Sequence, residues 1–389
     1  MKNKFFRSKL FSVGVIIFLM LSINACSNKP GTIGEFIYAA GWYTASGKTI
    51  ACYWKNGVKT DLTDGTIEAR ASGIYVSGSD VYVAGSYNDI TGVHACYWKT
   101  DTVTGIVTKI DLHESLEPYS VTVTSIYVID SVVYVAGSYT NGTGNFPCYW
   151  KSDPMDPPVS EINLHGSTEL ASVTATSIYV IDSVVYVAGS YTNGAGIVAW
   201  YWKYDPMTPP LTEIQLPVTT APVDKTIAGV TATSIYVSGS YVYVAGSYTN
   251  VTDNVVAARY WEAGTLTETD LPVSLVPASV TATSIYVSGA YVYVADTYIN
   301  GVANYAAMWT SYTGIVPATV TVTELTELTA PAGVTATSIY MIASDVYVGG
   351  YYTNGSISVA CYWKNGVRAD LPAVAGKTAE VESIFVTAL

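Results

Sequence analysis

The chain has few charged residues, and basic residues are fewer than acidic ones. Of its 389 residues, 18 are Lys or Arg and 30 are Asp or Glu, which gives a net charge of −12. Binding to nucleic acid or to anionic lipid head groups depends on clustered Lys and Arg, so this balance argues against both. Histidine is limited to three residues, and no Cys/His cluster has zinc spacing. No Gly-rich phosphate loop opens a helix. We therefore expect neither a metal nor a cofactor.

Helical periodicity is also missing. The sequence contains 33 Tyr residues and is rich in Val, Thr and Ile, which is the composition of β-strands. No segment has the spacing of an amphipathic helix. The fold class predicted from composition is therefore all-β.

Cysteine is scarce and regularly placed. Four of the five cysteines precede a Tyr-Trp pair in the same sequence motif: Cys52, Cys96, Cys148 and Cys361. Equivalent positions in different repeats lie too far apart for a disulfide, which needs Cα atoms within about 7 Å. We expect four free thiols, buried as small apolar side chains.

The N-terminus predicts export. Four basic residues precede an apolar stretch from Phe11 to Leu21, which is too short for a settled membrane span. The segment ends in "LSINAC", which resembles the lipobox of bacterial lipoproteins, although Asn24 departs from the usual small residue. That resemblance implies a signal peptide over residues 1–25, acylation (palmitate) of Cys26 and a short tether over residues 26–35. It also implies lipid anchoring in the cell envelope, at the outer membrane; ordinary secretion is the alternative.

Internal repetition dominates the rest of the chain. One unit combines an "SIYV" run, a "VYVAGSY" run, an "ACYWK" run and a short polar run that ends in Leu. The second and third motifs each occur seven times, and the third carries a Trp in every copy: Trp54, Trp98, Trp150, Trp202, Trp261, Trp309 and Trp363. The fourth motif ends at pairs such as Asp61-Leu62 and, in the sixth copy, Glu327-Leu328.

Each unit therefore predicts four short strands joined by Gly/Asn/Ser turns, which is the signature of a β-propeller blade. The first two strands are apolar at successive positions, as expected of a sheet covered on both faces by neighbouring blades. The fourth strand alternates acid or Thr with Ile or Leu, which suits an exposed outer edge. We predict a seven-bladed β-propeller of four-stranded blades over residues 36–389, forming a monomeric ring.

The first repeat lacks an "SIYV" strand, because the sequence enters its propeller at "EFIYAAGWY". The C-terminal "VESIFVTAL" carries an unaccompanied copy, "SIFV", at Ser383–Val386. We predict that this strand joins the N-terminal blade and closes the ring.

The repeats resemble those of uncharacterised secreted and lipoprotein β-propellers of bacteria, on the motifs "YWKNG" at Tyr53–Gly57 and "VYVAG" at Val81–Gly85. This resemblance covers residues 36–389. It implies fold and location, and no catalytic residues.

Most repeated aromatic residues are best explained as scaffold. The Trp set suits a stacked core, and an aromatic platform for sugars is the alternative. His113 and His165 occupy matching positions in neighbouring repeats, which raises the question of a shared metal. Outer strands of different blades fan apart, so we expect no shared ligation.

The candidate site lies where the repetition breaks. Five repeats approach their first strand with "TVTS" or "TATS", whose hydroxyls are expected to ring one mouth of the axial channel. The two remaining repeats read "RASG" and "EVES". If the ring closes as predicted, Arg70, Glu380 and Glu382 meet near the axis. They form either a salt bridge that latches the closure or a ligand-binding subsite.

Three functions remain open. The first is a non-enzymatic binding or scaffolding lipoprotein that recognises a protein or glycan of the envelope through its variable loops (Asp64–Arg70, His113–Tyr119, His165–Ala171 and Pro217–Gly229). The second is a lyase or hydrolase acting on a glycan or small molecule, with carboxylates at the channel mouth. The third is a structural or adhesion protein of the cell surface.

Overall fold

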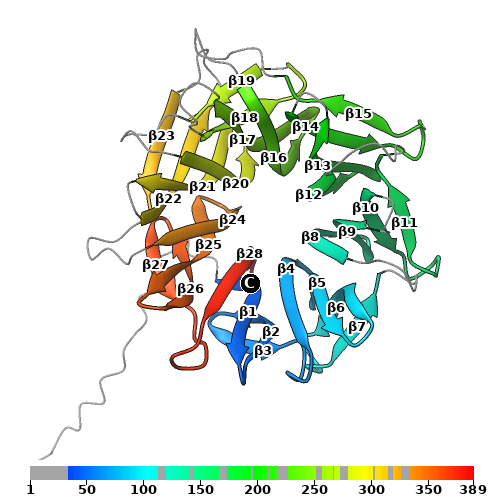
Figure 1. Cartoon of the computed structure of the whole chain (residues 1–389), viewed down its shortest axis with the longest axis vertical. Coiled ribbons are helices and arrows are strands. Elements are labelled where there is room, and N and C mark those ends of the chain that lie inside the picture. The colour runs from blue at the N-terminus through cyan, green and yellow to red at the C-terminus, as the bar shows by residue number, and fades with distance from the viewer. Residues whose placement is uncertain are drawn as a thin grey trace, which may run out of the picture. The chain divides into compact units, whose positions relative to one another are not determined.

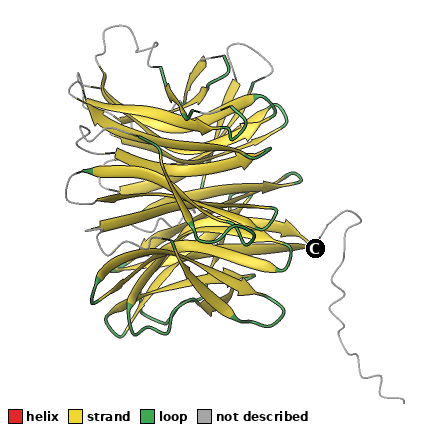
Figure 2. Cartoon of the chain, turned by 90° about the vertical axis from the view of Figure 1, so that its right-hand side faces the viewer, coloured by secondary structure: helices red, strands yellow, loops and turns green. Residues whose placement is uncertain are grey.

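A computed structural model describes residues 34–112, 120–140, 144–165, 173–193, 196–208, 210–217, 227–250, 256–265, 267–271, 279–300, 303–313, 319–325 and 333–389. Glu35–Leu389 forms one compact unit. Across the described ranges the regular structure is entirely β, as Figure 2 shows, so the all-β prediction is confirmed. No helix with the length and apolar character needed to cross a membrane occurs in the described residues. Cys26 and the signal segment lie outside them.

The strands fall into four groups according to their place in each repeat. The innermost are β4 (Glu68–Ser77), β8 (Ser120–Ile129), β12 (Val173–Ile181), β16 (Ile227–Ser238), β20 (Ser279–Ser288), β24 (Val334–Ile342) and β28 (Ala379–Ala388). The second are β1 (Glu35–Ala45), β5 (Asp80–Asp89), β9 (Val132–Thr140), β13 (Val184–Asn193), β17 (Tyr241–Asn250), β21 (Tyr291–Asn300) and β25 (Asp345–Asn354).

The third and fourth strands complete each repeat toward the outside. The third are β2 (Lys48–Lys55), β6 (Gly92–Asp101), β10 (Asn145–Ser152), β14 (Gly196–Tyr204), β18 (Val256–Glu262), β22 (Ala303–Tyr312) and β26 (Ile357–Lys364). The fourth are β3 (Val58–Asp61), β7 (Val107–Asp111), β11 (Ser160–Asn163), β15 (Thr212–Gln215), β19 (Thr267–Asp270), β23 (Thr319–Glu324) and β27 (Val367–Asp370).

Consecutive strands pair antiparallel within each repeat. Four repeats form separate four-stranded sheets, whereas the three repeats from β12 to β23 belong to one twelve-stranded sheet. The links inside this larger sheet are slight: one parallel residue pair, Ile197 with Gly229, joins β14 to β16, and another, Val256 with Ser279, joins β18 to β20. The repeats are thus distinct four-stranded units set around a centre, with the innermost strands nearest to it (Figure 1).

The hydrophobic core lies between neighbouring units. One cluster, for example, combines Tyr38 and Tyr53 of the first unit with Ile74, Val83 and Trp98 of the second. The seven third-strand Trp residues are at most 1% exposed. Burial to this degree favours the scaffold interpretation of these residues over a sugar platform. Cys52, Cys96, Cys148 and Cys361 are buried free thiols, as the sequence predicted.

Strands from opposite ends of the sequence lie side by side. β28 pairs antiparallel with β1, from Glu35 opposite Ala388 to Tyr43 opposite Ala379. It also contacts β24 on one side and β4 on the other. The predicted pairing of "SIFV" with the first repeat is therefore present in the register of these two strands.

An aromatic side chain from each innermost strand contacts the next one around the centre. Neighbouring ring centroids are 4.6–5.2 Å apart, and the order is Tyr75, Tyr127, Tyr179, Tyr236, Tyr286, Tyr340, Phe385 and back to Tyr75. Phe385 of β28 occupies the place that a tyrosine holds elsewhere. The C-terminal strand is thus built into the same belt of contacts as the internal repeats.

One boundary in the sixth repeat differs from the sequence prediction. The polar-apolar pair is Glu324-Leu325, and not Glu327-Leu328, because Leu325 is buried and its N–H bonds to the Ala306 carbonyl. The sequence "TELTEL" offers the pair twice, and the pairing of β22 with β23 uses the first copy. Residues 327 and 328 lie outside the described ranges.

Candidate functional site

The centre of the molecule is lined by residues that stand in β-bulges. Each innermost strand shifts register by one residue against its second strand, which leaves one residue unpaired: Ser72, Thr124, Thr176, Thr233, Thr283, Thr337 and Glu382. A bulge redirects the side chain of its extra residue. Here the bulge residues face a central cavity of about 130 Å³. The predicted ring of hydroxyls at the channel is confirmed for the five Thr repeats.

Hydrogen bonds fix the hydroxyls of this ring. Thr124 Oγ1 lies 3.1 Å from the Ala136 carbonyl of its own unit and 2.9 Å from the Ala175 carbonyl of the next. Thr337 bridges Gly349 and Val381 in the same way. The bulge hydroxyls therefore connect neighbouring units as well as lining the cavity.

A second set of hydroxyls follows directly. The serine after each bulge residue accepts a hydrogen bond from a backbone N–H of the next innermost strand; Ser125 accepts from Ile178 at 3.3 Å and Ser338 from Ile384 at 3.2 Å. Ser383 of β28 accepts from Ile74 of β4, also at 3.3 Å. The exception is Gly73, which offers no hydroxyl to Ile126. A Cβ at Gly73 would lie 3.1 Å from the Ile126 Cγ2 and 3.2 Å from the Ile126 nitrogen, so the two strands leave little room for a side chain here.

Glu382 is the carboxyl in this ring. It stands at the bulge position that other units fill with Thr or Ser, and it lines the cavity. Burial raises the pKa of Glu382; a hydrogen bond from the Trp42 indole and the charge of Arg70 oppose that rise. The Trp42 Nε1 donates to Glu382 Oε1 at 3.0 Å.

Trp42 brings the predicted site residues together. It pairs across the sheet with Glu380, and the Arg70 guanidinium carbon lies 3.9 Å from the centre of its ring. No ion pair within 4.0 Å joins Arg70 to Glu380 or Glu382 among the described residues. The three predicted residues thus gather around the Trp42 indole; Glu382 lines the central cavity, whereas Arg70 lines a different pocket. A cation over an aromatic face is stabilising.

The second carboxyl of the cluster, Glu380, is half-buried. Its pKa is raised by burial, and the neighbouring Glu382 adds to the rise, while a hydrogen bond from Ser358 and the charge of Arg70 oppose it. Tyr351 lies nearby, and its pKa is raised by burial and by the charges of both glutamates. Arg70 is exposed and lines a pocket of about 210 Å³ with Thr49, Glu68, Ser86, Tyr87 and neighbouring residues.

We refer to Trp42, Arg70, Tyr351, Glu380 and Glu382 as the seam cluster. The sequence motif before the first strand revealed its three charged members. It did not reveal Trp42 and Tyr351, which stand on second strands at a position that is Ser86, Ser138, Ser190, Ser247 and Thr297 elsewhere. Aligning the "VYVAGSY" motif one residue past its Gly would have found both.

The remaining predicted positions add little to the site. His165 bonds to Glu213 at 3.0 Å, and His113 lies outside the described residues, so a shared metal is not tested. Within the described ranges no group of three or more His, Cys, Asp or Glu side chains could hold a metal ion. Of the variable loops, residues 113–119, 166–171 and 218–226 lie outside the described ranges.

Comparison with known proteins gives the fold alone. No family model and no curated protein matches the chain. It is similar to the β-propeller domain of the Trilobed protease from Pyrococcus furiosus, which is described as having an open velcro topology. The TM-score is 0.53 at 10% identity, over 88% of this chain and 94% of that one.

Two further solved structures are similar. A post-proline cleaving enzyme from Rickettsia typhi gives a TM-score of 0.52 at 10% identity, over 87% of this chain and 53% of that one. A polysaccharide lyase of family PL25, an ulvan lyase, gives 0.49 at 9% identity, over 81% of each chain. The similarity to the Pyrococcus furiosus domain, at a TM-score above 0.5, shows a propeller-like fold.

Proposed function

We propose that this protein is a membrane-anchored, extracytoplasmic binding lipoprotein of the bacterial cell envelope that recognises a glycan through one face of a propeller. Cys26 carries the lipid. The seam cluster and the hydroxyl-lined strand ends beside it form the binding face.

The proposed scaffold is a seven-bladed propeller closed by β28. Three observations support this architecture: the pairing of β28 with β1, the hydrogen bond from Ile74 to Ser383, and the belt of aromatic contacts that returns from Phe385 to Tyr75. The pairing of β28 covers the inner edge of β1, which would otherwise be open to another chain.

One observation carries the functional proposal. The other repeats build the same strand ends with Thr and Ser, so the fold does not need an arginine, two carboxyls or an indole there. The seam cluster nevertheless places two carboxyls where burial raises their pKa, which is unfavourable for stability when they are ionised. Exposed Arg70 beside them offers a charged, planar donor to a ligand. Unfavourable, asymmetric polar groups in a symmetric scaffold are typical of a functional site.

The test compares Arg70→Thr, which restores the residue of five other repeats, with the unmodified protein. Both are purified from membranes with bound material retained, and the glycan and protein content of each eluate is measured beside thermal unfolding. We expect Arg70→Thr to keep the unfolding temperature within a few degrees and to lose the retained ligand. A variant that is destabilised but binds as before would leave Arg70 as a latch of the scaffold and overturn its role here.

Anchoring and orientation have separate readouts. Labelling with a palmitate analogue is expected in the protein and absent in Cys26→Ser. Protease accessibility on intact cells then distinguishes a surface-facing from a periplasmic propeller.

A second candidate function is a glycan-directed lyase or hydrolase. The observation that favours it is the pair of neighbouring carboxyls, Glu380 and Glu382, on β28, whose pKa values burial raises, since a raised pKa makes a carboxyl a better candidate for a general acid. Glu382→Gln keeps the size of the side chain and removes the acid. Turnover of an envelope glycan that is lost in Glu382→Gln, with binding retained, would establish the enzyme instead.

A further inference from the structure

Two adjoining pockets open on the channel-mouth face between neighbouring units. The first, about 340 Å³, lies between β8 and β12, with β9 and β10 at its base. The second, about 350 Å³, lies between β12 and β16, beside β13 and β14. Both volumes are at the lower end of the range for small-ligand sites, roughly 300–1,000 Å³. The pockets share Thr174 and Thr176, so β12 forms the wall between them.

Both pockets have a serine at the same position of the second strand. In the first pocket the second-strand residue is Ser138, which accepts a hydrogen bond from the Ala175 N–H at 3.1 Å; in the second it is Ser190, which accepts from Ala232 at 2.9 Å. At the seam the same position holds the much larger Trp42 and Tyr351. We therefore expect an aromatic side chain at this position to fill either pocket.

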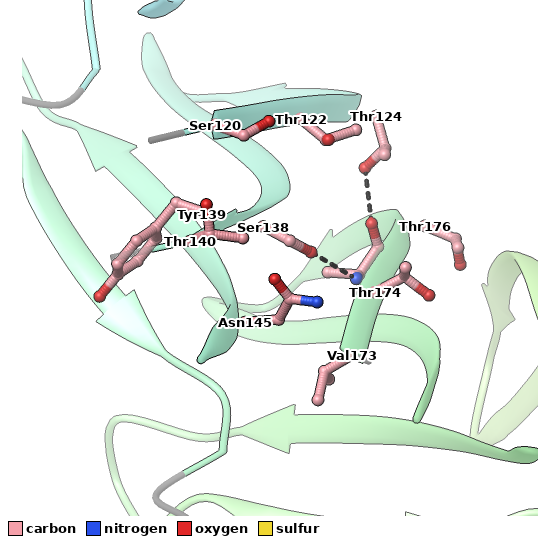
Figure 3. Close-up of a pocket in the computed structure, with 11 residues that line it drawn as sticks. Ser120, Thr122, Thr124, Ser138, Tyr139, Thr140, Asn145, Val173, Thr174 and Thr176 are labelled. Carbon is pink, nitrogen blue, oxygen red and sulfur yellow. Dashed lines mark hydrogen bonds between the residues drawn. The ribbon is translucent and has the colours of Figure 1, made fainter. Parts of the chain in front are cut away.

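Figure 3 shows how the first pocket is lined. Ser120, Thr122 and Thr124 of β8 lie along one side, and Thr174 and Thr176 of β12 along the other, with Ser138 and Asn145 between them. The Tyr139 ring points away from this group. Among the described residues, no hydrogen bond engages the side chains of Ser120, Thr122, Thr140 or Asn145.

The pocket chemistry is neutral and of mixed polarity. Neither pocket is lined by a charged side chain. Hydroxyl and amide groups both donate and accept hydrogen bonds, and the threonine methyls, Val173 and Ala175 supply apolar surface between them. Sugar rings have the same combination of hydroxyl edges and C–H faces. An acidic glycan would find no cation in these pockets and would meet the net negative charge of the protein.

We propose that the two pockets are consecutive subsites for a neutral oligosaccharide, with one sugar unit on each side of the β12 threonines. This inference rests on the proposed glycan-binding function and adds to it a place of binding outside the seam cluster, none of whose residues lines either pocket. The subsites are not identical, because Asn145 in the first occupies the position of Ile197 in the second. The chain of sugars is therefore bound in one direction, its more polar unit against Asn145.

The test fills the pockets with a side chain that the scaffold already accepts. Ser138→Tyr and Ser190→Tyr place at these positions the residue that the seventh unit has as Tyr351. The matched control is Ser138→Ala, which removes the same hydrogen bond to Ala175 and leaves the pocket open. Calorimetric titration with cellotetraose, maltotetraose and mannotetraose measures binding, with tetragalacturonate as the acidic comparison.

We expect at least one neutral tetrasaccharide to bind and tetragalacturonate not to bind. Ser138→Tyr and Ser190→Tyr should each weaken binding by at least about tenfold, and Ser138→Ala by much less. Binding that persists in both Tyr variants but is lost in Arg70→Thr would overturn the pocket assignment and leave the proposed function standing. Failure of the unmodified protein to bind any of the sugars, or preference for tetragalacturonate, would overturn the neutral-glycan inference. If membrane-purified protein also retains no glycan, the proposed function fails with it.

Discussion

The carboxylate of Asp296 accepts a hydrogen bond from the Trp309 indole, with 2.6 Å between Oδ2 and Nε1. Asp296 stands where the second strands of the other repeats carry Gly, as in "VYVAG". It is 0% exposed, and its other oxygen has no hydrogen-bond partner among the described residues. Burial raises the pKa of Asp296 from 3.8 to about 7.

This relationship predicts a pH dependence. Because the folded state binds the Asp296 proton more tightly than the unfolded state does, the contribution to stability is complete below about pH 4 and is lost as the pH rises to about 7. A shift of this size corresponds to at most about 4 kcal/mol. Asp296→Asn should remove this pH dependence, because the amide stays neutral like the protonated carboxyl. Urea unfolding followed by Trp fluorescence should therefore show a gain in stability over the unmodified protein at pH 8 and none at pH 4. Equal differences at both pH values would contradict the assignment.

Substitutions at Gly73 can measure what the serine hydroxyl of the other strands contributes to stability. Six innermost strands offer a serine hydroxyl to the next strand, and Gly73 leaves the Ile126 N–H without it. Gly73→Ser should have a free energy of unfolding about 1 kcal/mol higher than Gly73→Ala, because the serine hydroxyl adds the hydrogen bond while both variants share the tight Cβ contact with Ile126. Gly73→Ala is the control, since it adds the Cβ without the hydroxyl. If both variants are equally stable, the hydroxyl contributes nothing.

Replacing Trp42 should lower stability, because the half-buried Glu382 carboxyl then loses its hydrogen-bond donor. Trp42→Phe keeps an aromatic ring beside Arg70 and removes the N–H that bonds to Glu382. We expect a loss of about 1–3 kcal/mol near neutral pH, with a smaller loss at low pH because the pKa of Glu382 is already raised. In a Glu382→Thr background the same change should cost much less. Chemical denaturation of the four proteins completes the cycle, and additive effects would show that the two side chains are not coupled.

The β28 strand predicts the effect of a deletion. Removing Ser383–Leu389 takes away most of the pairing with β1 and the buried side chains of Ile384 and Val386. We expect the cooperative thermal transition in circular dichroism to be lost. Deleting only Leu389, which is 73% exposed, should leave the transition in place. A truncated protein that unfolds cooperatively at the original temperature would show that β28 does not complete the first unit.

The repeat pattern made most of the fold predictable. Four strands per unit, buried Trp and Cys side chains and the pairing of the C-terminal strand all follow from motifs that recur with little change. The bulge at Thr124 and its equivalents could not be foreseen, because a one-residue register shift depends on the partner strand and leaves no mark on apolar alternation. The "TELTEL" boundary was ambiguous for a similar reason, since only pairing with β22 selects the first copy.

The candidate site was predictable in part. Arg70, Glu380 and Glu382 depart from a five-fold repeated Thr motif, and the pairing of β28 with β1 brings them to one sector. A salt bridge among them was one of the two interpretations that their charges allowed, beside a ligand-binding subsite. Trp42 separates them, and its effect depends on side-chain volume at a position on a different strand. The pockets beside Ser138 and Ser190 could not be predicted either, because the space beside a small residue depends on the side chains of the strands around it.

The four buried thiols have a consequence for experiments on folding. Cys52, Cys96, Cys148 and Cys361 belong to the four separate four-stranded sheets, one thiol to each, and the twelve-stranded sheet has none. Burial raises the pKa of the Cys52, Cys96 and Cys148 thiols, so they are unreactive while their sheets stay intact. Each sulfur therefore reports the opening of its own sheet. The rate at which an alkylating reagent modifies each cysteine, measured by peptide mass spectrometry, gives the rate of local unfolding of that sheet without any introduced label.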